Sequence, residues 1–314
     1  MKLFWLAVGS LCALSGARAA APLFTWQQSA TNLALLHSGK IVWQLVFDPA
    51  QGKPYIHPLA TLAGTEITAL RPADHPWHRG LWWSWKYINH TNYWEEDKKT
   101  GLSDGRTDIT RVQAQVASNF SARVELDLSY HLPQQPPVMR EQRRLVFHPP
   151  TDAGRYAIDW IATFTAQQDL LLDRTPPHRD SQGRISGGSY AGLGLRFPRS
   201  FINVWTFLNS AGECGKQREG SGYGARWLDF SGPLSDGQTA GVTVLDNPAN
   251  VRHPTPWYWN PSLPFLCAAL LANEPLQLKA GDTLKLGYRI LVHTGAPPAE
   301  WIEQQWQEFA QQPQ

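Results

Sequence analysis

Two histidines separated by two residues are the first candidates for chemistry in this sequence. His75 and His78 lie in the segment DHPWHRGLWWSW, residues 74–85, in which Arg79 and several tryptophans follow closely. Pro76 favours a turn, in which both imidazoles can converge on a substrate or a metal ion. Because imidazole suits proton transfer near neutral pH, we expect His78 to be a general acid or base, and His75 and Arg79 to orient it and bind substrate oxygen atoms. The alternative is that one histidine binds a loop carbonyl and the other lies on the surface.

The tryptophans beside this motif are candidates for stacking on sugar rings. The chain has 15 tryptophans, more than a core requires. If residues 81–87 form a strand, alternate indoles point to opposite faces, so that some line a site while others pack inward. We therefore predict that Trp82, Trp85 and Trp94 contact substrate. The alternative is that these large aromatics fill a wide β core.

A charged loop at residues 173–180 follows a strongly apolar segment. Its proline pair restricts the backbone, which suits the positioning of His178 and Asp180. We expect one of these two side chains to supply a second proton-transfer group. Alternatively, Asp173 and Arg174 form only an ion pair at the end of a strand.

Two further loops carry candidate binding residues. Lys216 and Arg218 are suited to binding a carboxylate or stabilising an enolate-like charge, although they are equally compatible with solvated loop charges. In the proline-bearing turn at residues 246–254, Asn250 and Arg252 are expected to point at a ligand, and Trp257, which follows closely, is expected to contact it as well.

Standard catalytic signatures are missing from the chain. It contains no G-x-S-x-G, no H-E-x-x-H, no P-loop and no dinucleotide-binding glycine pattern. Serine hydrolysis, zincin chemistry and NAD use are therefore disfavoured. The cofactor is left open, and a divalent metal ion held by His75, His78 and His90 is one possibility.

Segments with β-type alternation or short apolar runs recur along the chain, between turn-rich stretches, at residues 41–47, 122–131, 156–165, 192–197, 241–245 and 284–293. This rhythm favours an antiparallel sandwich. The sequence shows no succession of alternating helices and strands, so a parallel sheet is disfavoured. We predict an all-β fold, a large antiparallel β-sandwich that occupies residues 21–314 as one domain.

One helix is predicted, at residues 299–310. Its apolar stripe follows helical spacing and comprises Trp301, Ile302, Gln305, Trp306 and Phe309. We expect this helix to dock on the sheet. The longest loops are expected at residues 95–106 and 210–224, and loops on a β scaffold often carry function.

The N-terminal segment MKLFWLAVGSLCALSGARAAAP has the pattern of a signal peptide. One lysine precedes an apolar run, and Ala17 and Ala19 form the A-x-A pattern that precedes a cleavage point. We predict a signal peptide over residues 1–20 and a periplasmic or secreted mature protein. The apolar run is shorter than the roughly 20 residues of a membrane span, and the residues before Cys12 do not form a lipobox.

The charge and the cysteine content argue against a nucleic-acid-binding or lipid-binding protein and against a fold built on disulfides. A net charge of +2 offers no basic face for nucleic acid or anionic lipid. The predicted mature chain retains Cys214 and Cys267, so at most one disulfide can form and the fold cannot depend on a disulfide framework. Whether the two cysteines pair is left open by the sequence.

Five segments together resemble the DUF6807 family: GKPYIHPL at 52–59, DHPWHRGLWWSW at 74–85, GGSYAGLGLRFP at 187–198, ARWLDFSG at 225–232 and GVTVLDNPANVRHPTPWY at 241–258. The resemblance spans nearly the whole predicted mature chain, and the H-x-x-H-R-G-L-W element is its most specific part. It implies an exported bacterial protein, often from organisms that degrade plant or algal glycans.

The chain departs from the family pattern at two positions. Trp77 stands where the family more often has histidine, and Asn247 stands where it often has another histidine. Both departures weaken a three-histidine metal site. We set aside the methane-oxygenase label that members carry, because a membrane copper enzyme needs spans that this sequence lacks.

The β-rich pattern with its H-P-x-H-R-G segment is similar to that of large carbohydrate-active sandwiches of the galactose mutarotase type. We therefore expect an exported enzyme that acts on a glycan or modified sugar by histidine acid/base chemistry, as a lyase, epimerase or hydrolase. The absence of a matched carboxylate pair favours elimination or epimerisation. The alternatives are a non-catalytic glycan-binding protein and a histidine-ligated metal oxidoreductase.

Overall fold

The computed structural model describes residues 23–179, 181, 185–215, 220–260 and 262–312. The predicted signal peptide lies outside this part of the chain, as do the candidate residues Asp180, Lys216 and Arg218.

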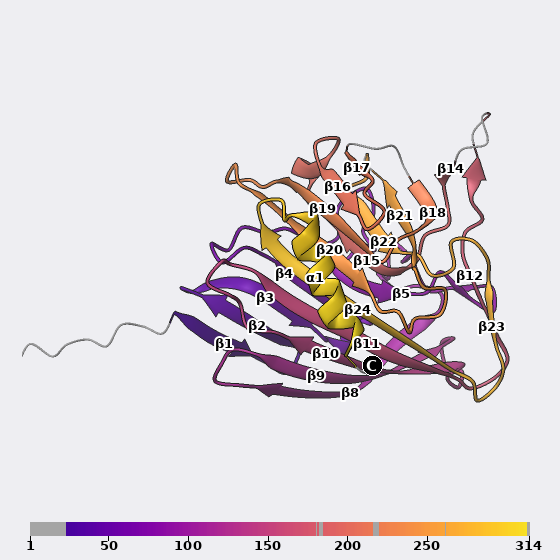
Figure 1. Ribbon diagram of the computed structural model, residues 1–314. Coiled ribbons are helices and arrows are strands. Elements are labelled where there is room, and N and C mark those ends of the chain that lie inside the picture. Colours follow the sequence, from indigo (N-terminus) through magenta and orange to yellow (C-terminus); the bar gives the residue numbers. More distant parts are fainter. Residues whose placement is uncertain (1–22, 180, 182–184, 216–219, 261, 313–314) are drawn as a thin grey trace, which may run out of the picture.

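Two large antiparallel sheets face each other (Figure 1). Over the described residues, the first sheet has nine strands in the order β1-β2-β3-β4-β5-β15-β22-β21-β18. Their bounds are β1 Phe24–Gln28, β2 Asn32–His37, β3 Lys40–Val46, β4 Tyr55–Leu59, β5 Leu81–Ser84, β15 Gly192–Arg196, β22 Phe265–Ala268, β21 Pro256–Asn260 and β18 Gly220–Gly224.

The second sheet also has nine strands within the described ranges, in the order β17-β16-β19-β20-β24-β11-β10-β9-β8. Their bounds are β17 Cys214–Gly215, β16 Thr206–Asn209, β19 Trp227–Pro233, β20 Thr239–Asp246, β24 Thr283–Thr294, β11 Tyr156–Ala166, β10 Met139–Phe147, β9 Ala122–His131 and β8 Arg106–Val116. The six apolar segments predicted as strands lie in β3, β9, β11, β15, β20 and β24, so the predicted all-β sandwich is confirmed.

Short elements complete the fold. A small sheet joins β23 Leu276–Leu278, β12 Leu170–Asp173, β6 Tyr87–Ile88 and β7 Thr91–Asn92, and a hairpin pairs β13 His178–Arg179 with β14 Ile185–Gly187. Two 3₁₀ turns, η1 Pro49–Gln51 and η2 Arg199–Phe201, lie in connections. The segment predicted as a long loop at 210–224 contains β17 and β18, whereas residues 95–105 have no strand.

The core between the sheets is rich in stacked aromatic rings. Trp83 of β5 stacks on Trp160 of β11 with ring centroids 4.9 Å apart, and Trp43 of β3 stacks on Phe147 of β10 at 3.9 Å. These side chains are at most 3% exposed. Burial of such large rings and their offset contacts supply much of the stabilisation of a sandwich.

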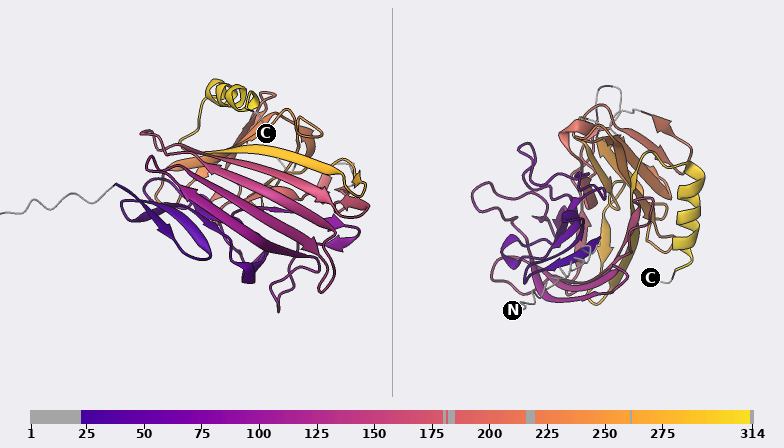
Figure 2. Two further views of the ribbon diagram at one scale, coloured as in Figure 1. Left: turned by 90° about the horizontal axis from the view of Figure 1, so that it is seen from below. Right: turned by 90° about the vertical axis from the view of Figure 1, so that its left-hand side faces the viewer.

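The C-terminal helix α1, Ala299–Ala310, has the predicted bounds. Ile302 and Phe309 are buried against Trp227, Leu245 and Leu291 on the outer side of the second sheet. Figure 2 shows the helix outside the sandwich, in the right-hand view. The expectation that it docks on the sheet is confirmed.

Side chains of strand β5 point alternately into the core between the sheets and to the opposite face of the first sheet. The predicted strand at 81–87 is shorter than expected, because β5 ends at Ser84. Alternation nevertheless holds: Trp83 and Trp85 point into the core between the sheets, and Trp82 joins a second cluster on the other face. This other face, which we call the outer face, carries the histidine motif.

Candidate functional site

The histidines of the H-x-x-H segment lie together in a turn that leads into β5. The N–H of His75 donates to the carbonyl of Pro72, and the N–H of His78 donates to the carbonyl of His75, each at 3.0 Å. Their ring centroids are 4.7 Å apart. Gly80 then has a φ of 71°, and a Cβ there would lie 2.6 Å from the Ile56 carbonyl oxygen. The turn into the strand therefore requires glycine.

Three aromatic rings on the outer face form a floor beneath His78. The His78 centroid is 5.0 Å from that of Trp82, 4.8 Å from Phe265 and 6.0 Å from Trp94. A Cβ on Gly194 of β15 would lie 3.1 Å from both Trp82 and Phe265. Glycine at this position lets the two rings close over the strand. We call Trp82, Trp94 and Phe265 the aromatic floor. All three are at most 2% exposed, so Trp82 and Trp94, predicted to contact substrate, instead support the His78 ring from within the fold.

A buried arginine anchors one end of this floor. Nη2 of Arg196, at the end of β15, donates to Oδ2 of Asp74 at 2.6 Å. The same carboxylate oxygen lies 3.7 Å from Nδ1 of His75. Burial opposes ionisation of Asp74, but the hydrogen bond and positive charge of Arg196 outweigh it and lower the pKa of this carboxyl. Asp74 is therefore an ionised partner for His75.

Burial keeps both imidazoles neutral. It lowers the pKa of His78 well below 6.5, and the nearby His75, Arg196 and Lys53 lower it further. Burial also lowers the pKa of His75, although Asp74 opposes this shift. At neutral pH both rings can therefore accept a proton. The His75 side chain is 33% exposed whereas His78 is 2% exposed, so His75 is the ring that a ligand meets first.

Several buried polar atoms near the floor lack a partner. Nδ1 of His78 and the indole nitrogens Nε1 of Trp77 and Trp82 have no hydrogen-bond partner within the described ranges. Buried polar groups are normally satisfied, and exceptions ask for an explanation. The indole nitrogens of Trp43, Trp83 and Trp85 in the core between the sheets also lack partners, so this feature is not confined to the outer face.

A second polar group lies at the other end of the floor. Lys86, which follows β5, forms an ion pair with Oε2 of Glu95, and the Tyr190 hydroxyl donates to Oε1 of Glu95 at 3.0 Å. The Tyr190 and Trp94 ring centroids are 5.6 Å apart. Burial opposes ionisation of Glu95, but Lys86 and these hydrogen bonds prevail, so its pKa is lowered. Burial lowers the pKa of Lys86, against the opposing charge of Glu95.

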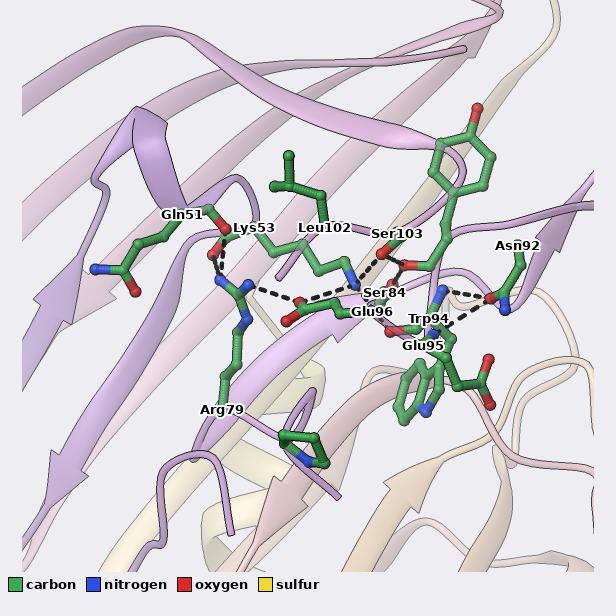
Figure 3. Close-up of polar contacts among 12 residues, drawn as sticks. Gln51, Lys53, Arg79, Ser84, Asn92, Trp94, Glu95, Glu96, Leu102 and Ser103 are labelled. Atoms are coloured by element: carbon green, nitrogen blue, oxygen red, sulfur yellow. Dashed lines mark hydrogen bonds and ion pairs between the residues drawn. The ribbon is translucent and has the colours of Figure 1, made fainter. Parts of the chain in front are cut away.

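The next residue, Glu96, points the opposite way, into a buried cationic cluster (Figure 3). Oε1 of Glu96 accepts from Arg79 Nη2 at 2.6 Å and from Lys53 Nζ at 3.4 Å, and Oε2 accepts from Arg71 Nη1 at 3.0 Å. Arg71 also donates to the Pro76 carbonyl at 3.2 Å. Glu96 therefore ties the histidine turn to the loop that carries Trp94, and Arg79, predicted to bind substrate oxygens, is held by this carboxylate.

The indoles of Trp85 and Trp257 lie away from the histidines. Trp85 is 1% exposed and packs on Phe164 of β11, at 5.1 Å between centroids. Trp257 is fully buried, and its Nε1 donates to the Ala225 carbonyl at 2.9 Å. Their predicted substrate contacts are thus corrected to packing in the core between the sheets, because strand alternation turns them inward.

The polar residues of the turn after β20 form hydrogen bonds within the fold that stabilise the turn. Nδ2 of Asn250 donates to Oδ1 of Asp246 at 2.7 Å and to the Gly287 carbonyl at 2.8 Å, and its Oδ1 accepts from the Gly287 N–H at 2.7 Å. The guanidinium of Arg252 donates to the carbonyls of Leu270, Glu274 and Pro275. Both residues were expected to bind substrate, and the structure gives them the role of fixing loops.

The remaining candidates are not gathered at the aromatic floor. His178 is exposed on the β13–β14 hairpin, and His90 is exposed in the turn between β6 and β7. Among the described residues, no three His, Cys, Asp or Glu side chains are grouped so that they could hold a metal ion. Cys214 is exposed, Cys267 is buried, and both are free thiols.

The sequence interpretation missed Lys86, Glu95, Tyr190 and Arg196 as site residues. Tyr190 and Arg196 both lie in the GGSYAGLGLRFP segment, and Glu95 begins the loop predicted as functional. Those signals were present. The pairing of β5 with β15, which brings the two segments together, cannot be recognised from the sequence alone.

Comparisons with known proteins identify a family and a set of distant structural neighbours. The model of a family described as a family of unknown function (DUF6807) matches residues 32–307. A search of the curated proteins found no match. The part of the chain that the structure describes contains no helix long and apolar enough to cross a membrane.

The solved structures that resemble this one do so at low identity. The alpha-galactosidase from Lactobacillus brevis is 12% identical, with a TM-score of 0.46 over 92% of this chain and 42% of that one. The galactosidase domain of an alpha-galactosidase-sucrose kinase is 10% identical, with a TM-score of 0.39 over 87% and 41%. An aldose 1-epimerase candidate from Klebsiella pneumoniae is 9% identical, with a TM-score of 0.44 over 89% and 83%. This chain thus spans less than half of the two galactosidase chains.

Proposed function

The chain belongs to the DUF6807 family of unknown function, and we propose that it is a carbohydrate-active enzyme that binds a sugar beside the histidine turn, against the partly exposed Trp77 ring, and moves a proton with His75 and His78. The observation that carries the proposal is the pair of neutral imidazoles 4.7 Å apart, of which His75 is 33% exposed and lies 3.7 Å from the Asp74 carboxylate. Sugars present both apolar ring faces and hydroxyl groups, so they match such a surface.

The two histidines have different tasks in this proposal. His75 is the more exposed ring, so it contacts the sugar and accepts or returns its proton. Asp74 accepts no proton but stabilises the imidazolium that forms on His75. His78 is fixed between His75 and the floor, and its burial keeps it neutral and immobile. The exposure of the two rings thus shifts the contact with substrate from His78, which the sequence favoured, to His75.

The reaction class follows from the available groups. The lowered pKa values keep both imidazoles in the neutral form at neutral pH, so they are available to accept a proton and hold none to donate as imidazolium, while their basicity is reduced. In a modified sugar, His75 would remove the proton from a carbon next to a carbonyl or carboxyl group. Elimination then breaks the C–O bond at the next carbon and the leaving oxygen takes up a proton, whereas epimerisation returns a proton to the opposite face; we prefer these reactions to hydrolysis by two carboxylates. The predicted signal peptide makes export part of the same proposal. N-terminal sequencing of protein from the periplasm or medium tests it, with cleavage expected near Ala19 or Ala20.

The proposed activity is tested by a mass-spectrometric and NMR screen of plant and algal oligosaccharides in D₂O. The proteins compared are wild type, His75→Ala, His78→Gln and His90→Ala, each without residues 1–20. We expect wild type and His90→Ala to form a product that the other two variants do not form. Product mass separates elimination from hydrolysis, which adds water, and uptake of deuterium at carbon reveals epimerisation.

The control variant also separates the rival hypotheses. Product formed equally by His75→Ala and His78→Gln would overturn the proposed proton transfer. Ligand retained by all variants without any product would support a glycan-binding protein instead. Loss of activity in His90→Ala together with the other histidine variants, and its recovery with added metal, would support the metal oxidoreductase.

A further inference from the structure

A cavity of about 290 Å³ lies beside the buried cationic cluster, between the η1 turn, the loop at residues 96–105 and the start of β8. Its wall contains the cationic side chains of Lys53, Arg79 and Arg106. His75 and His78 do not line it, so it is distinct from the proposed proton-transfer site. Its volume is close to the lower limit of small-molecule sites, about 300 Å³, and therefore suits a small ligand.

The charge on the wall of this cavity is positive on balance. Glu96 lines the cavity, but its carboxylate oxygens already accept hydrogen bonds from the three cations around it. Asp108 also lines the cavity, with a side chain that is 58% exposed and an Oδ2 that lies 2.8 Å from a histidine nitrogen. Among the lining residues, two carboxylates thus stand against three cations, and Arg71 adds a fourth positive charge behind Glu96.

Two guanidinium groups on the wall have buried nitrogen atoms without a partner. Nη1 of Arg106 and Nε of Arg79 form no hydrogen bond with any of the described residues. An unpaired donor of a buried charged group costs more than an unpaired neutral indole N–H. An oxyanion in the cavity would give Arg106 an acceptor and would add a counter-charge for both guanidinium groups.

The backbone fixes the position of Arg106 at the cavity. The N–H of Gly105 donates to the Asn92 carbonyl at 2.9 Å, and a Cβ on Gly105 would lie 2.3 Å from the Tyr93 ring. This close approach requires glycine and determines where β8 begins. Arg106 is the first residue of that strand and pairs with His131 of β9. A regular sheet therefore positions the guanidinium.

Lys53 contributes charge to the cavity rather than a free donor. Its ammonium donates to the Trp94 carbonyl at 2.9 Å and to Ser103 Oγ at 2.8 Å, and it lies 3.4 Å from Oε1 of Glu96 (Figure 3). Burial lowers the pKa of Lys53 to about 7, although Glu96 opposes this shift. A second negative charge nearby would favour the protonated form of Lys53.

We propose that this cavity is an anion-binding site, which takes the carboxylate or sulfate group of a small ligand and holds it with the Arg106 guanidinium, close to the positive charges of Arg79 and Lys53. A guanidinium donates two parallel hydrogen bonds to such a group, and these charge-assisted bonds are roughly twice as strong as neutral ones. The site goes beyond the proposed function, because it involves neither His75 nor Trp77. It would let the protein recognise acidic ligands, although the chain as a whole has a net charge of only +2.

Isothermal titration calorimetry, with sodium chloride holding the ionic strength constant, tests the proposal. The probes are sodium sulfate, sodium glucuronate and, as the neutral counterpart of glucuronate, glucose. The proteins are wild type, Arg106→Gln, Arg106→Lys and, as a matched control, Arg111→Gln, which lies on the same strand and whose side chain is 48% exposed. Melting temperatures verify that each variant is folded.

We expect wild type and Arg111→Gln to bind sulfate, glucuronate or both equally well, with a dissociation constant below about 10 mM. Arg106→Gln should bind the same anion about tenfold or more weakly, because a charged hydrogen-bond donor is lost. Arg106→Lys keeps the charge but loses the planar fork, so its affinity should lie between those of wild type and Arg106→Gln. Binding of sulfate alone would assign the site to sulfate groups, and binding of glucuronate alone would assign it to sugar carboxylates.

Three results would overturn the proposal. The first is that neither anion binds wild type below about 10 mM. The second is equal binding of the anion by wild type and Arg106→Gln, which would place the anion elsewhere on the protein. The third is binding of glucose with the same dependence on Arg106, since recognition would then not need a negative charge. If Arg106→Gln does not fold, Arg106→Lys replaces it, and equal affinity of that variant and wild type has the same meaning.

Discussion

Substituting Glu96 by glutamine should destabilise the protein strongly. Glutamine has nearly the same size, so the change removes a charge and little volume. It leaves Arg79, which is 1% exposed, without its counter-charge at 2.6 Å. Removing one partner of a buried ion pair costs about 3–5 kcal/mol, because the remaining charge stays buried and uncompensated.

The three cations around Glu96 do not contribute equally to this cost. Lys53 already has a pKa lowered to about 7 by burial, so it can lose its proton when Glu96 is neutral. Arg71 is 33% exposed and is hydrated in part. Arg79 can do neither, because a guanidinium stays charged and this one is buried. We therefore expect a loss near the lower end of the range, about 3 kcal/mol.

Denaturation by urea, followed by tryptophan fluorescence, measures this loss. Asp169→Asn is the control, because its pair with Lys279 has side chains 65% and 75% exposed, and its midpoint should stay close to that of wild type. The double variant Glu96→Gln with Arg79→Met should be more stable than Glu96→Gln alone, since it removes the stranded charge. If Glu96→Gln lost less than about 1 kcal/mol, the assignment of Glu96 as the tie between the two loops would be wrong.

Three other predictions concern the fold and its buried groups. Burial lowers the pKa of Lys53 from 10.5 to about 7, so between these values the unfolded state binds more protons and stability rises with pH, by up to about 1.4 kcal/mol per unit from this group. A Lys53→Met variant should lack that rise between pH 7 and 9 in urea titrations, and an unchanged slope would contradict the burial. Trp85→Ala should cost about 3–5 kcal/mol in the same assay without changing the affinity for a glycoside, whereas a selective loss of binding would return Trp85 to the site. Burial raises the pKa of Cys267 to about 12, so a thiol reagent at pH 8 should label Cys214 alone in the native state, and rapid labelling of two thiols would show that β22 opens.

Elements with a strong local pattern could be predicted from the sequence. The alternation in residues 122–131 matches β9, and the apolar stripe of residues 299–310 matches α1. The histidine turn was also predictable, because Pro76 disfavours the alternatives. In each case the physical cause lies within a few residues of the element itself.

Features that depend on distant pairing could not be predicted in this way. Asp74 meets Arg196, and Glu95 meets Tyr190, only because β5 pairs with β15 across more than a hundred residues. No periodicity in either segment encodes that contact. The same limit explains Trp257 and Asn250, whose chemical types suit a ligand but whose strand and turn direct them into the fold.

The alternation of β5 and the two residues after it explains why one segment serves both the core and the site. Trp83 and Trp85 complete the core between the sheets, while Trp82 and Lys86 provide the floor and one end of the site on the outer face. The register of this one strand therefore sets both the packing of the core and the positions of the side chains on the outer face. A shift by one residue would exchange every side chain between the faces and place Lys86 in the core. Since the cost of such a shift falls first on the stacked contact between Trp83 and Trp160, the packing of the core is what holds the outer indole and the lysine in the geometry that the proposed sugar site needs.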